Sequence, residues 1–305
     1  MKFEVTILGS GSSTPSLRRN PASQLVNIQE NYFLVDCGEG TQLQMRKYKV
    51  KFQRINHVFI SHLHGDHYLG LIGLLQSMHL LGRKNELHIY AHPDLKEMID
   101  LHMKISHTRL TYTIQFHPLS YDQPQVIFDN KMLEVSTVIL KHRIPTCGFV
   151  FREKQKLLPI SSEALKTYSI PVYALPGIKE GKDFITGEGK VIPNKELTLA
   201  RPASYSYAYC SDTIYHEKII DSIQGVDVLF HESTFTSELN DRAKETFHST
   251  AAQAATIALK AGVKRLVLGH FSVRYHDMDR FITEAREVFP ATEIAEDGLT
   301  ITIYP

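Results

Sequence analysis

The residues that most constrain this chain are three histidines and an aspartate within six positions, the run HLHGDH at 62–67. Imidazole nitrogens and carboxylate oxygens are typical zinc ligands, and a hydrolytic zinc site keeps one coordination position for water. If the run leaves a strand in extended form, His62 and His64 point to the same side, and Asp66 and His67 can serve a second ion. A single histidine is usually an ordinary core or surface residue, but this crowding is unfavourable without a cation among the side chains. The run therefore predicts a metal site.

The chain on both sides of the run alternates between strand and helix patterns. Residues 57–61 form an apolar strand-like segment, and residues 68–82 have the apolar spacing of a helix. The N-terminus has strand patterns at 3–8, 24–28 and 31–36. The turn GSGSST after the first strand lacks the third glycine of GxGxxG and the GK[ST] of a Walker loop, so we interpret it as an ordinary connection. The alternation predicts an α/β fold.

Two ions need more ligands than the run contains, and three candidates follow predicted strands elsewhere. His142 follows the strand pattern 132–140, Asp212 follows 207–211, and His270 follows 266–269. Loops after strands are where α/β folds commonly gather reactive groups. These three residues are therefore the candidates to complete the metal site.

Residues 152–195 interrupt the alternation, because they are rich in proline and glycine and have few periodic apolar residues. They contain eight basic and five acidic residues, a mild basic bias. A segment of this length without clear structure is uncommon unless it is functional or disordered. A solvated loop without a partner and a substrate-binding arm are both open on this evidence.

Composition excludes some classes of protein and compartment. Thirty-four Lys and Arg residues balance thirty-three Asp and Glu residues, so the net charge does not indicate a polyanionic partner. The three cysteines are widely spaced, which argues against a disulfide framework and a thiolate zinc site and favours a reducing compartment. No apolar stretch reaches the roughly 20 residues that span a bilayer. We expect a cytoplasmic protein without a membrane segment.

The HLHGDH run, the later His142, Asp212 in SDT and His270 in LGHFS resemble the metallo-β-lactamase superfamily. Within it, the chain closely resembles the ribonuclease Z family of tRNA 3′-processing endonucleases over nearly its whole length. The resemblance implies a four-layer αββα sandwich formed by one domain, 1–305. It also implies that residues 152–195 are a protruding flexible arm.

Two segments with family counterparts suggest contacts with tRNA. PSLRRN at 15–20 is similar to the family loop PxKxRN, which senses the CCA end of mature tRNA, and it supplies Arg18 and Arg19. Leu17 stands where that pattern has lysine, so rejection of CCA-ended tRNA is left open. Pro176 and Gly177 look like part of the arm that clamps the tRNA body. The alternative for the two arginines is that they are solvated loop charges.

Two further segments support the same family. GHFSVRY at 269–275 is similar to the family's ending around its last metal histidine, and FHST at 247–250 is similar to its HST loop. Ser249 and Thr250 would bind substrate there, because a helix N-terminus is a good place to hold phosphate. Alternatively they only cap the next helix, since Thr250 with Gln253 fits a capping box.

The resemblance implies two Zn²⁺ ions per subunit, with Mn²⁺ or another divalent metal as the alternative. One ion would be held by His62, His64 and His142, the other by Asp66, His67 and His270, with Asp212 bridging them. Two such ions can activate a shared water and stabilise the attacking and leaving oxygens at phosphorus.

Two catalytic roles are also assigned on the basis of this resemblance. Asp66 would be the base, and His248 would be the general acid, because it is the only other histidine in a motif. Glu232 would orient His248, or be an ordinary carboxylate at a strand end.

The implied function is removal of the 3′ trailer from precursor tRNA, which leaves a 3′-hydroxyl on the tRNA and a 5′-phosphate on the trailer. The family also implies a homodimer in which the arm of one subunit serves the other's site. One alternative is a small-molecule phosphodiesterase or arylsulfatase of the same superfamily, against which the arm and the HST loop argue. Another is a catalytically silent RNA-binding scaffold, against which the intact set of seven ligands argues.

Overall fold

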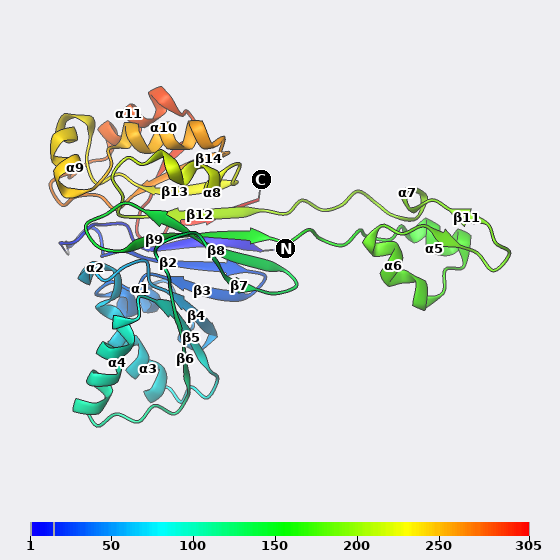
Figure 1. Ribbon diagram of the computed structural model, residues 1–305, viewed down its shortest axis with the longest axis horizontal. Helices are drawn as coiled ribbons and strands as arrows, with labels where there is room; N and C mark the ends of the chain where they lie inside the picture. The colour runs from blue at the N-terminus through cyan, green and yellow to red at the C-terminus, as the bar shows by residue number, and fades with distance from the viewer. Residues whose placement is uncertain (1, 15, 305) are drawn as a thin grey trace. The chain divides into compact units, whose positions relative to one another are not determined.

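The computed structural model describes residues 2–14 and 16–304, and its larger unit is built on two seven-stranded sheets (Figure 1). The first sheet has the order β16-β1-β2-β3-β4-β5-β6. Its strands are β1 (Phe3–Gly9), β2 (Ser23–Ile28), β3 (Asn31–Val35), β4 (Ile55–Phe59), β5 (Leu87–Ala91), β6 (Ile114–Pro118) and β16 (Thr300–Thr302). Strands β1 to β3 form the predicted antiparallel meander, and β3 to β6 pair in parallel.

The second sheet has the order β15-β14-β13-β12-β9-β8-β7. Its strands are β7 (Val126–Asp129), β8 (Leu133–Leu140), β9 (Thr146–Glu153), β12 (Ser206–Cys210), β13 (Val228–Glu232), β14 (Arg265–Gly269) and β15 (Thr292–Ile294). Strands β12 to β15 pair in parallel. Parallel pairing places the carboxyl ends of these strands at one edge of the sheet, as it does for β3 to β6.

Aromatic side chains fill the space between the two sheets. Phe59 of the first sheet lies with its ring centroid 5.4 Å from that of Phe149 and 5.8 Å from that of Phe151. The ring centroid of Phe33, also in the first sheet, lies 5.8 Å from that of Phe151. Large rings at such spacings stabilise a packed interior beyond their area burial, so the two sheets share one apolar layer.

Helices cover the outer face of each sheet, which gives the four-layer αββα arrangement (Figure 1). The first sheet is covered by α1 (Thr41–Lys47), α3 (Gly70–Leu80) and α4 (Asp94–Ile105), and the second by α8 (Ile220–Ile223), α10 (Ala251–Ala261) and α11 (Asp279–Val288). Helix α3 buries Leu71, Leu74, Leu75 and Met78, the stripe that helical periodicity predicts. The predicted sandwich is confirmed. The remaining short helices of this unit are α2 (Gly65–Tyr68), α9 (Asn240–Thr246), η1 (Phe52–Arg54), η3 (Glu217–Ile219) and η4 (Ser237–Leu239).

Strands β6, β7 and β9 of the larger unit are among those absent from the sequence-based prediction. Strands β6 and β7 are short and lie at sheet edges, where side chains are only partly buried and the apolar alternation is weak. Strand β9 is almost wholly buried, so it has no alternation at all. The predicted helix 68–82 is also interrupted, because α2 ends at Tyr68 and α3 begins at Gly70.

The smaller unit comprises residues 152–204 with residues 130–134. It contains α5 (Ser162–Tyr168), η2 (Val172–Ala174), α6 (Leu175–Glu180), β10 (Phe184–Ile185), β11 (Val191–Ile192) and α7 (Asn194–Leu197). These elements surround a small core of Ala164, Ile178, Phe184, Ile192 and Leu197. Elements of two to seven residues are too short to give a visible period, so the sequence showed no structure here. The role of this unit as a flexible arm stays a prediction.

Cys37, Cys147 and Cys210 are buried and form no disulfide. Within residues 2–14 and 16–304, no helix is long and apolar enough to cross a membrane.

Three histidines stack across neighbouring strands of the first sheet. The ring centroids of His57 and His88 are 4.9 Å apart, and those of His88 and His117 are 5.3 Å apart. Burial, together with the charges of His88, His117 and Arg83, lowers the pKa of His57 to about 4. This folded-state pKa lies below the unfolded-state value of about 6.5.

Because the folded pKa of His57 is depressed, stability from its neutral form is present above about pH 6.5 and is lost as the pH falls toward 4. Replacing His57 with Phe keeps a ring beside Phe33 and Phe128. We expect His57→Phe to lose less unfolding free energy than the original protein between pH 7 and pH 4.5, measured by urea titration. The difference in unfolding free energy between the two proteins at pH 8 gives the effect of the substitution on packing alone. Parallel stability curves for the two proteins would contradict this assignment.

Candidate metal centre

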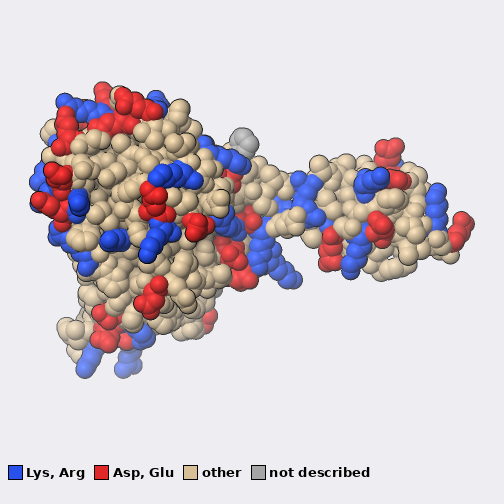
Figure 2. Space-filling view, turned by 45° about the horizontal axis from the view of Figure 1, so that its top comes forward, with Lys and Arg blue, Asp and Glu red and all other residues tan. Residues whose placement is uncertain are grey.

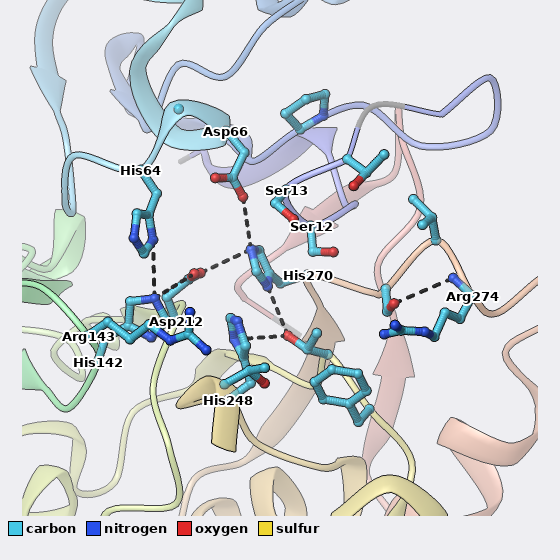
Figure 3. A pocket seen from close by; sticks show the side chains of 18 of the residues that line it. Ser12, Ser13, His64, Asp66, His142, Arg143, Asp212, His248, His270 and Arg274 are labelled. Atoms are coloured by element: carbon cyan, nitrogen blue, oxygen red, sulfur yellow. Dashed lines mark hydrogen bonds and ion pairs between the residues drawn. The ribbon is translucent and has the colours of Figure 1, made fainter. Parts of the chain in front are cut away.

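All seven predicted ligands meet where strands of the two sheets end. Figure 3 shows His64, Asp66, His142, Asp212 and His270 around one cavity. The run 62–67 follows β4 and enters α2, while His142, Asp212 and His270 follow β8, β12 and β14. The ligand atoms form two groups, each within 4.8 Å, and a third such group, Asp212, His248 and His270, shares one residue with each of them. The first group comprises His62, His64, His142 and Asp212, and the second comprises Asp66, His67 and His270.

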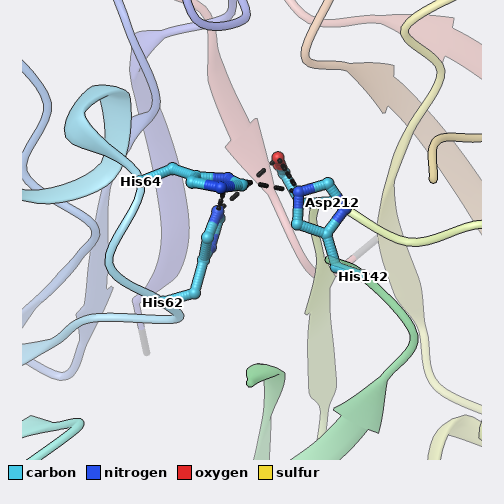
Figure 4. Close-up of side chains that lie close together, drawn as sticks. All are labelled: His62, His64, His142 and Asp212. Atoms are coloured by element: carbon cyan, nitrogen blue, oxygen red, sulfur yellow. Dashed lines mark hydrogen bonds and ion pairs between the residues drawn. The ribbon is translucent and has the colours of Figure 1, made fainter. Parts of the chain in front are cut away.

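The first group points three imidazole nitrogens at one spot (Figure 4). His64 Nδ1 lies 3.1 Å from His62 Nε2 and 3.2 Å from His142 Nε2. Asp212 Oδ2 lies 3.6 Å from His62 Nε2 and 3.7 Å from His142 Nε2. Burial lowers the pKa values of all three histidines, so they present neutral nitrogens.

The second group lies on the other side of Asp212. Asp212 Oδ1 is 3.0 Å from His270 Nε2 and 3.2 Å from His67 Nε2. Asp66 Oδ2 is 3.4 Å from each of the same two nitrogens. Each oxygen of Asp212 therefore faces a different group, which is the geometry of a bridging carboxylate.

Hydrogen bonds outside the two groups decide which nitrogen of each ring faces inward. His67 Nδ1 donates to Asp36 Oδ2 at 2.7 Å, and His142 Nδ1 donates to the carbonyl of Phe247 at 2.9 Å. The Nε2 atoms of both rings are left with lone pairs that face inward. Such outer partners fix the tautomer and orientation of a metal-binding histidine.

The donors fit divalent cations. His67 Nε2 is buried, has no hydrogen-bond partner and faces carboxylate oxygens of Asp66 and Asp212. A buried nitrogen without a partner is costly, and a cation between these atoms would satisfy it. Imidazole and carboxylate donors are the set that zinc uses in hydrolytic sites.

Four residues around this centre have left-handed backbone conformations that are uncommon for side chains other than glycine. Asp36, Asp212, Phe247 and His270 have φ between 54° and 60°. Such strain clusters at functional sites, where the surrounding structure holds it. At Asp36 and His270 it turns the chain immediately after β3 and β14.

His248 lies beside both groups, with its ring centroid 5.1 Å from that of His142 and 5.5 Å from that of His270. Its Nδ1 lies 2.8 Å from Glu232 Oε1, so the structure shows the contact that the predicted orienting role of Glu232 requires. Burial alone would lower the pKa of His248, but the Glu232 carboxylate outweighs it and raises the pKa to about 9.

The two groups open into a cavity of about 670 Å³. Three exposed arginines line it, Arg143 after β8, Arg242 on α9 and Arg274 after β14. Sequence reasoning missed them as site residues, although Arg143 and Arg274 stand close to predicted ligands. Acidic and basic side chains are interspersed over the face shown in Figure 2, so these local cations matter more than any global field.

The predicted RNA-contacting loop residues are tied to the protein itself. Arg18 and Arg19 each donate to a backbone carbonyl, of His276 and Tyr275 respectively, at 3.3 Å. Leu17 is fully exposed. Pro15 of the same motif lies outside the described residues. Neither arginine lines the cavity of the metal centre.

Ser249 and Thr250 are buried, and their hydroxyls have partners within the chain. Ser249 donates to the carbonyl of Thr213 at 2.7 Å, and Thr250 forms the predicted capping box with Gln253 at the start of α10. The structure gives Thr250 the capping role, whereas the Ser249 hydroxyl is engaged with the Thr213 carbonyl and does not cap the helix. Pro176 and Gly177 lie in the first turn of α6 in the smaller unit.

Asp36 is the functional residue that sequence reasoning overlooked most completely. It is fully buried and accepts hydrogen bonds from the Ser61 amide (2.8 Å), the Ser61 hydroxyl (2.9 Å), Tyr209 (2.7 Å) and His67. A carboxylate immediately after the apolar strand β3 was the only available signal. Its partners come from both sheets, so no local pattern could show them.

Known proteins match this chain over most or all of its length. The family model described as "Anti-Pycsar protein Apyc1" matches residues 3–166. Ribonuclease Z of Bacteroides thetaiotaomicron is 49% identical over 302 residues, which cover 99% of this chain and 96% of the relative. Ribonuclease Z of Porphyromonas gingivalis strain W83 is 40% identical over 301 residues, 99% of each chain.

Solved structures agree with these relatives. The crystal structure of human tRNase Z, short form, aligns with a TM-score of 0.72 and 28% identity, covering 99% of this chain and all of the other. The metallo-β-lactamase fold protein YhfI from Bacillus subtilis aligns with a TM-score of 0.70 and 21% identity, covering 99% of this chain and all of the other. The latter supports the fold alone.

Replacing Asp36 with Asn would turn an amide donor toward groups that already donate to this position. We expect Asp36→Asn to lower Zn²⁺ affinity by about 10- to 100-fold, the usual effect of losing an outer partner of a metal ligand. Competition with a chromophoric chelator measures it. Asp100→Asn on α4, where the aspartate is exposed, is the matched control. Unchanged affinity in Asp36→Asn would contradict the role.

Proposed function

Because the chain belongs to the ribonuclease Z family, and to the family whose model is described as Anti-Pycsar protein Apyc1, we propose that it removes the 3′ trailer from precursor tRNA. The cut leaves a 3′-hydroxyl on the tRNA and a 5′-phosphate on the trailer, and the enzyme depends on zinc. The observation that carries this proposal is the pair of ligand groups with the His248–Glu232 pair beside them in one cavity.

The proposed metal load is two Zn²⁺ per subunit, held by the two ligand groups with Asp212 between them. Mn²⁺ or another divalent ion fits the same nitrogen and oxygen donors. When bound, two such ions lower the pKa of water and stabilise the attacking and leaving oxygens of an in-line displacement at phosphorus.

Asp66 is proposed to orient the attacking water and to accept its proton. Its side chain lines the cavity and is held by His67 and His270. Burial would raise the pKa of Asp66, but these two histidines outweigh it and lower the pKa well below its ordinary value. The carboxylate is therefore ionised at every pH at which the protein would work.

His248 is proposed to protonate the leaving 3′-oxygen of the tRNA. Its Nδ1 is engaged with Glu232, so Nε2 is the nitrogen free to donate. A pKa of about 9 keeps the imidazole protonated at neutral pH, as a general acid requires.

Arg143, Arg242 and Arg274 are proposed to hold phosphates of the strand that crosses the cavity. Phosphate contacts from arginine fix the register of a nucleic acid and carry no sequence information. The proposed contacts of Arg18, Arg19, Pro176, Gly177, Ser249 and Thr250 come from the family resemblance, and shape recognition of RNA suits such backbone contacts.

A homodimer is the proposed assembly, with the arm of one subunit serving the active site of the other. Several large apolar side chains on the helices that cover the first sheet are exposed, and a second copy could bury them. They are Leu43, Leu80, Leu81, Leu101 and Ile105.

The function is tested by incubating zinc-loaded protein with a 3′-extended precursor tRNA and with a CCA-ended tRNA, and mapping both product ends. Cleavage of a small phosphodiester without cleavage of the precursor would favour the small-molecule alternative. No cleavage of either substrate would favour the silent scaffold.

We expect His248→Ala to lower the rate on precursor tRNA by about 10²- to 10⁴-fold, because the 3′-oxygen then leaves without a proton. Bis(4-nitrophenyl) phosphate is the matched control substrate, since its leaving group needs no proton and should be released at a near-normal rate. Full activity of His248→Ala on precursor tRNA would refute the assignment.

Deleting residues 172–192 should raise KM for precursor tRNA and leave hydrolysis of bis(4-nitrophenyl) phosphate nearly intact. Equal loss on both substrates would refute the arm. Mixing this deletion with His248→Ala then tests the dimer. If an arm acts in trans, the mixture recovers activity that neither protein has alone, because the intact site of one subunit receives the arm of the other.

A further inference from the structure

The hydroxyl of Thr234 contacts three groups of the proposed active site. Thr234 Oγ1 lies 2.7 Å from Glu232 Oε2, 3.0 Å from His270 Nδ1 and 3.2 Å from His248 Nδ1. Only 4% of the residue is exposed. Figure 3 shows His248 and His270 on the cavity wall, and this hydroxyl joins the two rings.

The donors and acceptors around the Thr234 hydroxyl determine the direction of each of its hydrogen bonds. The two oxygens of Glu232 accept hydrogen bonds from backbone amides, Oε1 from Thr213 at 2.9 Å and Oε2 from Thr234 at 3.0 Å. An amide N–H can only donate, so both carboxylate oxygens act as acceptors. The single hydrogen of the Thr234 hydroxyl therefore goes to Glu232 Oε2. Oγ1 can then only accept from His270, which requires the ring hydrogen on Nδ1 and leaves the Nε2 lone pair facing Asp66 and Asp212.

The first sheet repeats the same arrangement. The Ser61 hydroxyl donates to Asp36 Oδ2 at 2.9 Å and lies 3.0 Å from His62 Nδ1. The single hydrogen of the Ser61 hydroxyl is directed to Asp36, so the hydroxyl oxygen can only accept from His62 Nδ1. In each half of the molecule, a buried carboxylate orients a hydroxyl, and that hydroxyl orients a histidine. Asp36 and Ser61 act on His62 of the first ligand group, and Glu232 and Thr234 act on His270 of the second.

The position of Thr234 is set by the backbone around it. Its amide donates to Glu232 Oε2 at 3.0 Å, and its carbonyl accepts from the Ser272 amide at 3.2 Å. The Ser233 amide donates to the Gly269 carbonyl at 2.8 Å. The loop after β13 is thus fastened to the loop that carries His270, and the hydroxyl has little freedom to move.

We propose that Thr234 is a positioning residue that sets the ring orientation and tautomer of His270 for the second ion and couples that ligand to the Glu232–His248 pair. The inference deepens the proposed function and rests on it only for the role of His248. Its effect is confined to one ligand group, because His62 and His142 take their outer hydrogen bonds from Ser61 and Phe247.

The test is a stepwise Zn²⁺ isotherm without RNA, so that its outcome is independent of whether tRNA is the substrate. His270→Ala identifies the binding step that belongs to the Asp66–His67–His270 group. Thr234→Val keeps the shape of the side chain and removes the hydroxyl. We expect it to weaken that step by about 10- to 100-fold and to change the other step by less than about 3-fold.

Thr234→Ser restores the hydroxyl and should bind both equivalents nearly as the original protein does. Ser61→Ala should show the opposite pattern, with the step of the His62–His64–His142 group weakened. If Thr234→Val does not fold, the same isotherm is measured on Thr234→Ala. Normal affinity in the variant without the hydroxyl, equal weakening of both steps, or no rescue by Ser would overturn the proposal.

Discussion

The structure depends on the crowding of imidazole and carboxylate groups around Asp212. Its two oxygens lie between 3.0 and 3.7 Å from four histidine nitrogens that belong to two ligand groups. Lone pairs at this density repel one another unless cations lie among them. The packing of both sheets, the strained turns and the outer hydrogen bonds all hold these side chains in place.

That crowding is maintained by a buried polar layer beneath the ligands. Asp36 immediately follows β3 of the first sheet, and Glu232 is the last residue of β13 in the second. Each carboxylate accepts hydrogen bonds from a hydroxyl and a histidine. A buried carboxylate is tolerated when its oxygens are fully hydrogen-bonded. The same groups that stabilise the interior therefore determine which ring nitrogens face the cavity, so stability and chemistry share one network.

The His248–Glu232 pair shows how closely the proposed acid and the candidate metal ligands are connected. Phe247, immediately before His248, supplies the carbonyl that fixes His142, and Thr234, two residues after Glu232, contacts His270. The loop that carries His248 is thus hydrogen-bonded to one ligand group, and the loop after β13 to the other.

The sequence by itself determined the candidate ligands and the α/β class, because a run of metal-binding residue types between a strand and a helix, and single such residues after apolar strands, are local patterns. It also indicated the Thr250 cap, since a capping box spans four residues. Asp36, Thr234 and the three cavity arginines were decided only by the tertiary structure. Their partners are far apart in the chain, as Asp36 and Tyr209 are, and meet only through strand order and sheet packing. Strand β9 and the short elements of residues 152–204 were not predicted for a related reason. Their side chains are buried by neighbouring elements, and their apolar residues show no regular spacing in the sequence.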